Sequence, residues 1–221
     1  MIRLSLFDLD GTLTQEPSAW EYIHRRLGLW EGYAERFQEA FQKGEIDYHR
    51  FCQLDAALWK GKAVEEIFGI LKEIPHYEGI QDLLTFLKSK GILAAIISSG
   101  LSFLAQWMKK RYGFDEAIAN DLETFDGKLT GGIRIHVYHD RKGEWVKWAC
   151  RRFHVLPQEV LAIGDSSGDI DMFLQTGYSI AFNPRCDRLA SLATWSVRSG
   201  DLRTLIPLLE PLLNLKLPPA Q

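Results

Sequence analysis

The chain has 221 residues, of which 46% are hydrophobic and 25% are charged, so it can bury the core of one sizeable domain, or of one domain with an insertion. Its 26 basic and 29 acidic residues give a formal net charge of -3, which provides no electrostatic footprint for nucleic acid or an anionic membrane surface. No apolar stretch approaches the length of a membrane span, and Asp8 comes too early for a signal-peptide core. We therefore expect a cytoplasmic protein with no nucleic-acid or membrane partner, and the oligomeric state stays open.

Cysteine and histidine spacing gives no sign of a disulfide framework or a zinc site. Cys52, Cys150 and Cys186 are far apart and form no Cys-x-x-Cys pair, which favours free, buried thiols. His136 and His139 would point to opposite faces of an extended strand, and no third ligand is near them in the sequence. We therefore assign no metal-binding role to these side chains.

The first third of the chain predicts one strand followed by helices. Residues 3–9 are typical of a buried strand, whereas residues 18–71 carry apolar side chains at helical spacing with almost no strand signal. This pattern predicts a small helical bundle inserted after the first strand. Its tryptophans, Trp20, Trp30 and Trp59, are expected in the core of that bundle rather than as substrate platforms.

After Pro75, strands and helices alternate. Short apolar runs predict buried strands at residues 92–97, 117–119, 160–163 and 178–182, and helical patterns occupy residues 80–90, 101–112, 144–153, 170–174 and 189–192. Asp126 and Gly127 indicate a hairpin turn, and residues 202–217 favour a docked terminal helix. This alternation predicts an α/β fold with a parallel sheet covered by helices on both faces.

Two acids follow the first strand. Asp8 and Asp10 lie two residues apart, a spacing that points side chains to the same side of an extended strand. Carboxylates held close together repel each other unless a cation compensates them, and Gly11 permits the sharp turn that a close approach to a ligand needs. A strand followed by an ordinary Asp-Gly turn is the alternative interpretation of this motif alone.

Polar side chains also follow two other strands. Ser98 and Ser99 come after the second apolar strand, residues 164–169 come after a later one, and Lys142 precedes a helix. A helix cap, a turn or a solvated lysine would explain any one of them. Ligands of open parallel sheets bind beyond the carboxyl ends of the strands, however, where strand order reverses. The convergence of these positions therefore predicts one site.

This set of motifs resembles the haloacid dehalogenase superfamily, and it is most similar to the phosphoserine-phosphatase-like branch. The matching positions are residues 8–12, Ser98, Lys142–Glu144 and Gly164–Phe173 including Asp165 and Asp169, with residues 119–120 and 126–131. Lys147 is a competing candidate for the lysine motif, but the spacing of Lys142 to Gly164 matches that branch better. The resemblance implies a Rossmann-like parallel sheet with a catalytic core at residues 1–14 and 76–221 and a helical cap at residues 15–75.

The resemblance also implies the roles of the site residues. Asp8 would be the nucleophile that forms an aspartyl-phosphate, and Asp10 would protonate the leaving oxygen and then activate water. Ser98 and the backbone N–H of Ser99 would hold phosphoryl oxygens, and Lys142 would offset negative charge on Asp8 and the transferred group. The presence of Asp10 excludes the dehalogenases and phosphonate-cleaving relatives, which lack this second acid.

Magnesium is the cofactor that the resemblance implies. Mg²⁺ prefers oxygen ligands, and the expected ones are the carboxylates of Asp8 and Asp165 with the backbone carbonyl of Asp10. Asp169 is expected to hold the loop, Lys142 or a metal-bound water instead.

The match to true phosphoserine phosphatases weakens in the helical insert. Their glutamate that meets the substrate amine would fall at Pro17, beside Glu16, and their carboxylate-gripping arginine would fall at residues 53–55, with Arg50 a turn away. We therefore expect a Mg²⁺-dependent phosphatase acting on a small phosphorylated metabolite. The alternatives are phosphoserine phosphatase proper, a phosphomutase, and a non-catalytic phospholigand-binding module.

Overall fold

The computed structural model describes residues 1–214 and contains one seven-stranded sheet in the order β4-β3-β2-β1-β5-β6-β7. The strands are β1 (Leu4–Phe7), β2 (Leu93–Leu101), β3 (Glu116–Phe125), β4 (Lys128–Arg134), β5 (Val160–Gly164), β6 (Tyr178–Phe182) and β7 (Trp195–Val197). Every neighbouring pair is parallel except β3 and β4, which form an antiparallel hairpin. Because β1 pairs with both β2 and β5, the strand order reverses beside it, where a ligand site is expected.

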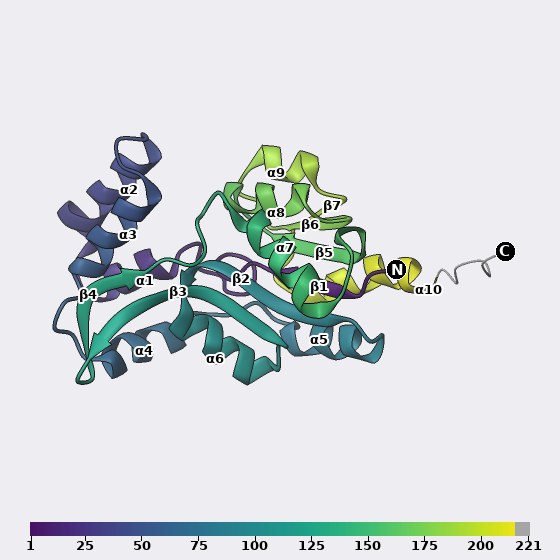
Figure 1. The fold of residues 1–221 in the computed structure, drawn as a ribbon, viewed down its shortest axis with the longest axis horizontal. Coiled ribbons are helices and arrows are strands. Elements are labelled where there is room, and N and C mark those ends of the chain that lie inside the picture. Colours follow the sequence, from purple (N-terminus) through teal and green to yellow (C-terminus); the bar gives the residue numbers. More distant parts are fainter. Residues whose placement is uncertain (215–221) are drawn as a thin grey trace.

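Two apolar layers cover the sheet (Figure 1). On one face, Phe7 packs in a cluster with buried residues of α5 (Ile80–Ser89) and α6 (Ser102–Tyr112). On the other face, Leu4 and Leu6 pack with residues of α7 (Lys142–Phe153), α8 (Ile170–Leu174) and α9 (Asp187–Leu192). Alternate residues of β1 thus enter opposite layers, as the strand geometry requires. The predicted α/β fold with helices on both faces is confirmed.

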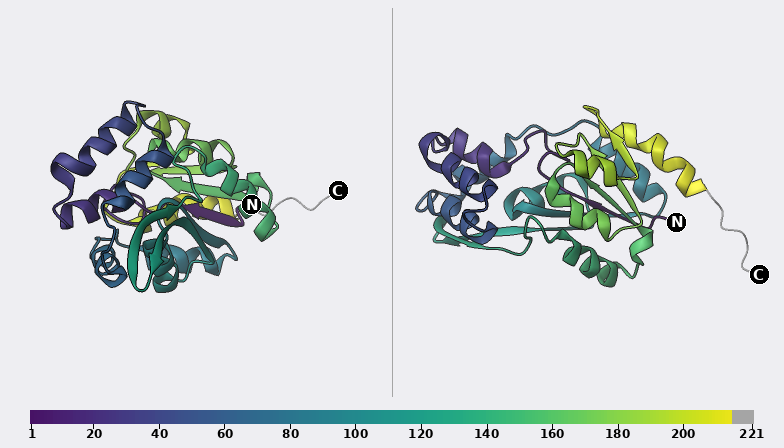
Figure 2. Two further views of the ribbon diagram at one scale, coloured as in Figure 1. Left: turned by 60° about the vertical axis from the view of Figure 1, so that its left-hand side comes forward. Right: turned by 90° about the horizontal axis from the view of Figure 1, so that it is seen from above.

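The remaining helices between β1 and α5 form the helical segment, which we define as residues 15–75. It contains α1 (Ala19–Arg26), the π-helical turn η1 (Trp30–Ala34), α2 (Glu35–Gln42), α3 (Tyr48–Ala57) and α4 (Val64–Lys72). Trp20 and Trp59 stack at 5.2 Å between ring centroids, and both are buried, as is Trp30. Figure 2 shows these helices gathered at one end of the molecule, away from the N-terminus.

The β3–β4 hairpin reaches the helical segment. Gly61 donates its backbone N–H to the carbonyl of Leu129 at 2.8 Å, and Leu129 donates to the carbonyl of Lys62 at 2.9 Å. The turn at Asp126 and Gly127, which the sequence predicted, has positive φ at both residues. The predicted strand at residues 117–119 is the start of a longer strand, because its outer half pairs with β4.

Differences from the predicted elements lie mostly near the C-terminus. The edge strand β7 was not predicted; it is three residues long and pairs with β6. The predicted terminal helix begins with the 3₁₀ turn η4 (Leu202–Leu205) and continues as α10 (Ile206–Asn214), and its expected extension to residue 217 lies outside the described residues. Two further 3₁₀ turns are η2 (Pro157–Glu159) and η3 (Ser167–Asp169). Within residues 1–214, no helix combines the length and apolarity needed to span a bilayer.

The cysteines are free, as the sequence predicted. Cys52 and Cys150 are buried, and Cys186 is half-buried. His136 is hydrogen-bonded to Asp121 at 2.8 Å, so its ring has a partner other than a metal.

Candidate active site

A cavity of about 540 Å³ lies where the loops after β1 and β5 and the carboxyl end of β2 meet the helical segment. Its floor includes Asp8, Asp10, Ser98 and Lys142, and its opposite wall comes from α1, α2 and α3. The size is ordinary for a small-molecule site. The motifs that the sequence placed at strand ends are therefore brought together in one cavity.

Lys142 is the positive centre of this site. Its Nζ lies 2.6 Å from Oδ1 of Asp8 and 2.7 Å from Oδ1 of Asp169, and its side chain is buried. The two neighbouring carboxylates raise the pKa of Lys142 despite its burial, which keeps the ammonium charged. Lys142 begins α7, whereas the competing candidate, Lys147, is exposed on the same helix.

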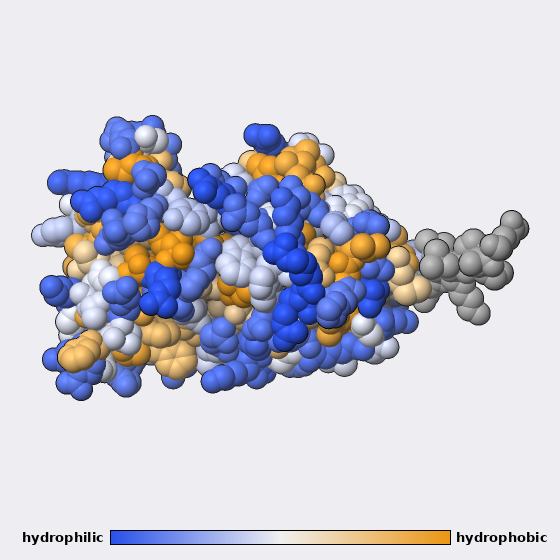
Figure 3. All heavy atoms as spheres, viewed as in Figure 1, coloured by the Kyte–Doolittle hydropathy of each residue, from blue (hydrophilic) through white to orange (hydrophobic). Residues whose placement is uncertain are grey.

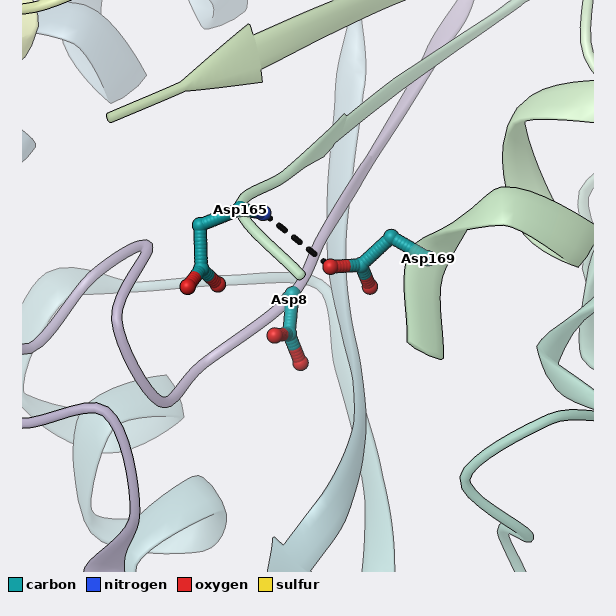
Figure 4. Close-up of side chains that lie close together, drawn as sticks. All are labelled: Asp8, Asp165 and Asp169. Atoms are coloured by element: carbon teal, nitrogen blue, oxygen red, sulfur yellow. Dashed lines mark hydrogen bonds between the residues drawn. The ribbon is translucent and has the colours of Figure 1, made fainter. Parts of the chain in front are cut away.

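Three buried carboxylates, those of Asp8, Asp165 and Asp169, place oxygen atoms within 4.8 Å of one another. Figure 4 shows the carboxylates of Asp8 and Asp165 pointing the same way, while Asp169 reaches toward them from the other side. Burial is the largest cause that raises the pKa of Asp8 to about 6 and that of Asp165 to about 8, and repulsion from neighbouring carboxylates adds to it. The ammonium of Lys142 and the guanidinium of Arg185, which pairs with Asp165, do not balance three carboxylates, so the donor set fits a further cation.

Asp169 has its oxygens already engaged. Oδ1 accepts from Lys142, and Oδ2 accepts from the backbone N–H groups of Asp165 and Ser166, both at 3.0 Å. The side chain thus ties the loop after β5 to the lysine. Each oxygen of Asp165 accepts one hydrogen bond, from Thr12 and from Arg185, and Asp8 accepts one from Lys142, so these two carboxylates keep more capacity for a cation than Asp169 does.

Asp10 lies in a different environment. Burial and the negative charge of Asp8 raise its pKa to about 7, and its Oδ1 has no hydrogen-bond partner among the described residues. Lys142 is bonded to Asp8 and Asp169 and not to Asp10. The two acids of the first motif therefore differ as acid–base catalysis requires: Asp8 has a cationic partner, and Asp10 can hold a proton near neutral pH.

Glycine is required at two close approaches. Gly11 has φ of +81°, and a Cβ atom there would lie 2.4 Å from Oδ2 of Asp165. At Gly100, a Cβ atom would lie 2.6 Å from Oδ2 of Asp10. Because glycine has no side chain, Gly11 lets Asp165 lie against the backbone of its loop, and Gly100 does the same for Asp10. The sequence predicted that strand alternation points Asp8 and Asp10 to the same side. Because β1 ends at Phe7, the loop after this strand positions both acids instead.

The carboxyl end of β2, where its pairing with β3 is irregular, is held by a buried asparagine. Ser98 is buried, and its Oγ accepts from the backbone N–H of Gly100 at 2.9 Å. The amide of Asn120 donates to the carbonyl of Ser99 at 2.9 Å, and its Oδ1 accepts from the backbone of His136 and of Val137, both at 2.8 Å. Asn120 therefore links the predicted phosphate-binding loop to the segment that leads to Lys142.

The sequence profile of haloacid dehalogenase-like hydrolases matches residues 5–174. The chain belongs to this family. The matched range runs from β1 through the loop after β5 to α8, and so includes every acid and the lysine described above.

The family members most informative for this hydrolase belong to its phosphoserine-phosphatase-like branch. A phosphoserine phosphatase of Methanocaldococcus jannaschii is 30% identical over 92% of this chain and 96% of its own length. One of Archaeoglobus fulgidus is also 30% identical, over 94% of this chain and 60% of its own length. A solved structure of a phospho-aspartyl intermediate analogue of phosphoserine phosphatase superposes with a TM-score of 0.82 at 28% identity, covering 94% of this chain and 98% of that one. A substrate-bound phosphoserine phosphatase superposes with the same TM-score and coverage at 27% identity.

Two residues that the sequence suggested for substrate contact do not line the described cavity of this hydrolase. Glu16 is half-buried in the segment after β1, and Arg50 is exposed on α3, whereas their neighbours Pro17 and Phe51 do line it. Trp20 is buried as predicted, yet it also forms part of the cavity wall.

Arg185 is a site residue that the sequence did not reveal. Its Nε donates to Oδ2 of Asp165 at 2.6 Å, and its Nη2 donates to the carbonyl of Pro17 at 3.4 Å. Because β6 pairs with β5, the residues after both strands meet at the cavity. Its position in the sequence could have indicated this role, because Arg185 follows a predicted parallel strand as the other motif residues do.

Proposed function

We propose that this hydrolase is a Mg²⁺-dependent phosphomonoesterase that cleaves a small phosphorylated metabolite through an aspartyl-phosphate. The observation that carries the proposal is the buried arrangement in which Lys142 contacts Asp8 while Asp165 faces the same space. A carboxylate nucleophile with a buried cationic partner suits attack on an anionic phosphate ester.

The reaction has two steps. In the first, an oxygen of Asp8 attacks phosphorus, the P–O bond to the leaving group breaks, and Asp10 donates its proton to the departing oxygen. In the second, Asp10 takes a proton from water, the resulting hydroxide oxygen attacks phosphorus, and the bond to Asp8 breaks to release inorganic phosphate. The raised pKa of Asp10, about 7, supports this alternation between acid and base.

Mg²⁺ would be held by the carboxylates of Asp8 and Asp165 and by the backbone carbonyl of Asp10. When bound, it would supply positive charge against the phosphoryl oxygens. The excess of buried carboxylates over buried cations supports this role, as does the complete engagement of Asp169. Ser98 and the N–H of Ser99 would hold the other phosphoryl oxygens.

We also propose a division into a catalytic core of residues 1–14 and 76–221 and a cap formed by the helical segment, residues 15–75. Side chains of α1, α2 and α3 line the cavity opposite Asp8, which supports a cap that encloses the substrate. Tyr48 of α3 reaches across the cavity to the carbonyl of Ser99. Enclosure of this kind excludes water while the aspartyl-phosphate exists.

Phosphoserine phosphatase is the second candidate, because the relatives above carry that name. The test is a panel of phosphate esters, containing phosphoserine, sugar phosphates and an activated aryl phosphate, assayed with Mg²⁺ for released phosphate. Release from at least one ester is expected. If no ester were hydrolysed, the chain would be a phospholigand-binding module instead, and phosphate transferred to a second sugar would identify a phosphomutase.

A further inference from the structure

The cavity wall opposite Asp8 is aromatic. Trp20, Phe41, Tyr48 and Phe51 line it from α1, α2 and α3. Phe41 and Phe51 are stacked, with ring centroids 5.1 Å apart and an interplanar angle of 13°, and Tyr48 packs against Phe41 at 5.8 Å. The rings of Phe41, Tyr48 and Phe51 pack against one another and so form a continuous wall. Figure 3 shows apolar surface beside α2 and α3 among other apolar patches on this face.

The polar groups on this wall are mostly uncharged. Gln38 and Gln42 line the cavity from α2, and their amides can both donate and accept hydrogen bonds. Glu21 also lines it, but its carboxylate lies 2.7 Å from the guanidinium of Arg25. The wall therefore carries no unpaired positive charge among the described lining residues.

The cationic side chains of Lys142 and Arg185, which line the cavity, already form ion pairs with aspartates. Lys142 contacts Asp8 and Asp169, and Arg185 contacts Asp165. His139 also lines the cavity, and its burial lowers its pKa, which favours the neutral ring. On the wall formed by α1, α2 and α3, a carboxylate of the leaving group would meet aromatic faces, neutral amides and Glu21, while the guanidinium of Arg185 is already paired with Asp165. Placing a carboxylate there without a partner is costly.

From this wall we infer that the natural substrate is a phosphate ester whose leaving group is uncharged and presents a flat apolar ring, with polar substituents that the two glutamine amides can reach. The inference rests on the proposed phosphomonoesterase function and names its substrate class. The ring would lie against Phe41 and Tyr48, which are half-buried and so keep some ring surface free.

There is room for such a group. A second cavity of about 510 Å³ shares Phe41, Tyr48 and His139 with the first. The aromatic wall therefore borders both spaces, and substituents on a ring can extend past it.

The test compares esters of primary alcohols, which differ little in leaving-group basicity: benzyl phosphate, propyl phosphate, phosphoserine, phosphoserine methyl ester and phosphocholine. We expect kcat/KM for benzyl phosphate to exceed that for propyl phosphate and for phosphoserine by at least roughly tenfold, since burial of apolar groups discriminates on this scale. The methyl ester, which lacks the carboxylate, should be cleaved faster than phosphoserine. A preference for phosphoserine would overturn the inference, and a preference for phosphocholine would show that the rings bind a cation instead.

Measurements of ester binding test this inference independently of the proposed catalytic function. The same esters are titrated calorimetrically into the Asp8→Asn variant, where turnover is not required. If the wild-type protein hydrolysed nothing, the proposed function would fail, yet the order of affinities would still decide the inference. Benzyl phosphate binding no tighter than propyl phosphate would contradict it.

Substitutions on α2 test which side chains of the wall determine the substrate preference. Phe41→Leu should lower kcat/KM for benzyl phosphate by a larger factor than for propyl phosphate and so remove most of the preference; an equal loss for both would indicate a merely structural role. Gln38→Arg places a cation on the wall and should raise kcat/KM for phosphoserine by roughly tenfold. Glu39→Gln is the matched control, because Glu39 is exposed on the same helix, is not a lining residue, and its substitution makes the same change in net charge. An equal gain in both variants would contradict the inference.

Discussion

The hydroxyl of Tyr48 donates a hydrogen bond of 2.6 Å to the backbone carbonyl of Ser99, and so joins α3 to the carboxyl end of β2. The amide of Asn120 donates to the same carbonyl at 2.9 Å and to the Tyr48 hydroxyl at 3.2 Å. The helical segment is thereby anchored to the backbone proposed to bind phosphate.

Tyr48→Phe should weaken catalysis without unfolding the protein. The variant keeps the ring but loses one hydrogen bond, worth about 1 kcal/mol, so kcat/KM should fall roughly fivefold. Ser99 keeps its second partner, Asn120, so the thermal midpoint should move little. Steady-state kinetics beside thermal unfolding check both expectations, and unchanged kinetics would remove Tyr48 from the positioning of this backbone.

Lys142→Met should impair formation of the phosphoenzyme in particular. It removes the buried partner of Asp8 and Asp169, so both carboxylates would be left without their ammonium, and the pKa of Asp8 would rise further above about 6. A loss of roughly 10²- to 10⁴-fold in the first step is expected, a range typical of one positioned catalytic group. Rapid-quench kinetics measure that step. Lys147→Met is the control, because Lys147 is exposed on the same helix and should be dispensable.

The binding of Mg²⁺ gives a third prediction. Calorimetric titration of Mg²⁺ should show one site, and Asp165→Asn should abolish it because a principal carboxylate ligand is lost. Gly11→Ala should also weaken it, since a Cβ atom would lie 2.4 Å from Oδ2 of Asp165. Asp187→Asn, at an exposed position on α9, should bind as the wild type does. Unaltered Mg²⁺ binding by Asp165→Asn would exclude this carboxylate as a ligand.

The titration of His76 should lower the stability of the folded chain as the pH falls. Its burial, with a smaller effect of Arg111, lowers its pKa below the ordinary value of 6.5. Well above pH 6.5 the ring is neutral in both folded and unfolded chains. As the pH falls below that value, the unfolded chain binds a proton before the folded chain does, so the contribution of His76 declines. Asp8, Asp10 and Asp165 act in the opposite direction, because their raised pKa values make the folded chain bind protons first.

Denaturant unfolding measured on both sides of pH 6.5 checks this expectation. Relative to the wild type, His76→Gln should lose less stability, or gain more, as the pH is lowered over the same interval, because the group that opposes folding at low pH is gone while the carboxylates still titrate. An identical slope in both proteins would mean that His76 titrates alike in the folded and unfolded chains. The His76 ring signal, followed by NMR, gives its folded pKa directly.

The sequence predicted the acids because their positions follow from strand ends. Asp8, Asp165 and Ser98 each come directly after an apolar run, and parallel pairing brings such positions to one edge of the sheet, although Ser98 lies within the longer strand β2. Lys142 required the resemblance, because a lysine before a helix is ordinarily solvated. Here a family pattern supplied what hydrophobic periodicity could not.

Residues that act through tertiary geometry were harder to predict. Arg185 meets Asp165 only because β6 lies beside β5, and Tyr48 meets Ser99 only because the helical segment folds back over the cavity. The direction in which α1, α2 and α3 present their side chains was not fixed by helical spacing alone. This is why Glu16 and Arg50 were expected at the substrate while Trp20, Phe51 and Gln38 line the cavity.

Transfer of the phosphoryl group to Asp8 is the step on which the proposed mechanism depends. It can be followed by mass spectrometry of protein quenched in acid during turnover of an activated aryl phosphate with Mg²⁺, comparing wild type with a folded Asp8→Asn variant. We expect a transient gain of one phosphoryl group on the peptide containing Asp8 in the wild type, and neither this adduct nor turnover in the variant. Normal turnover by Asp8→Asn, or an adduct on another residue, would exclude Asp8 as the nucleophile.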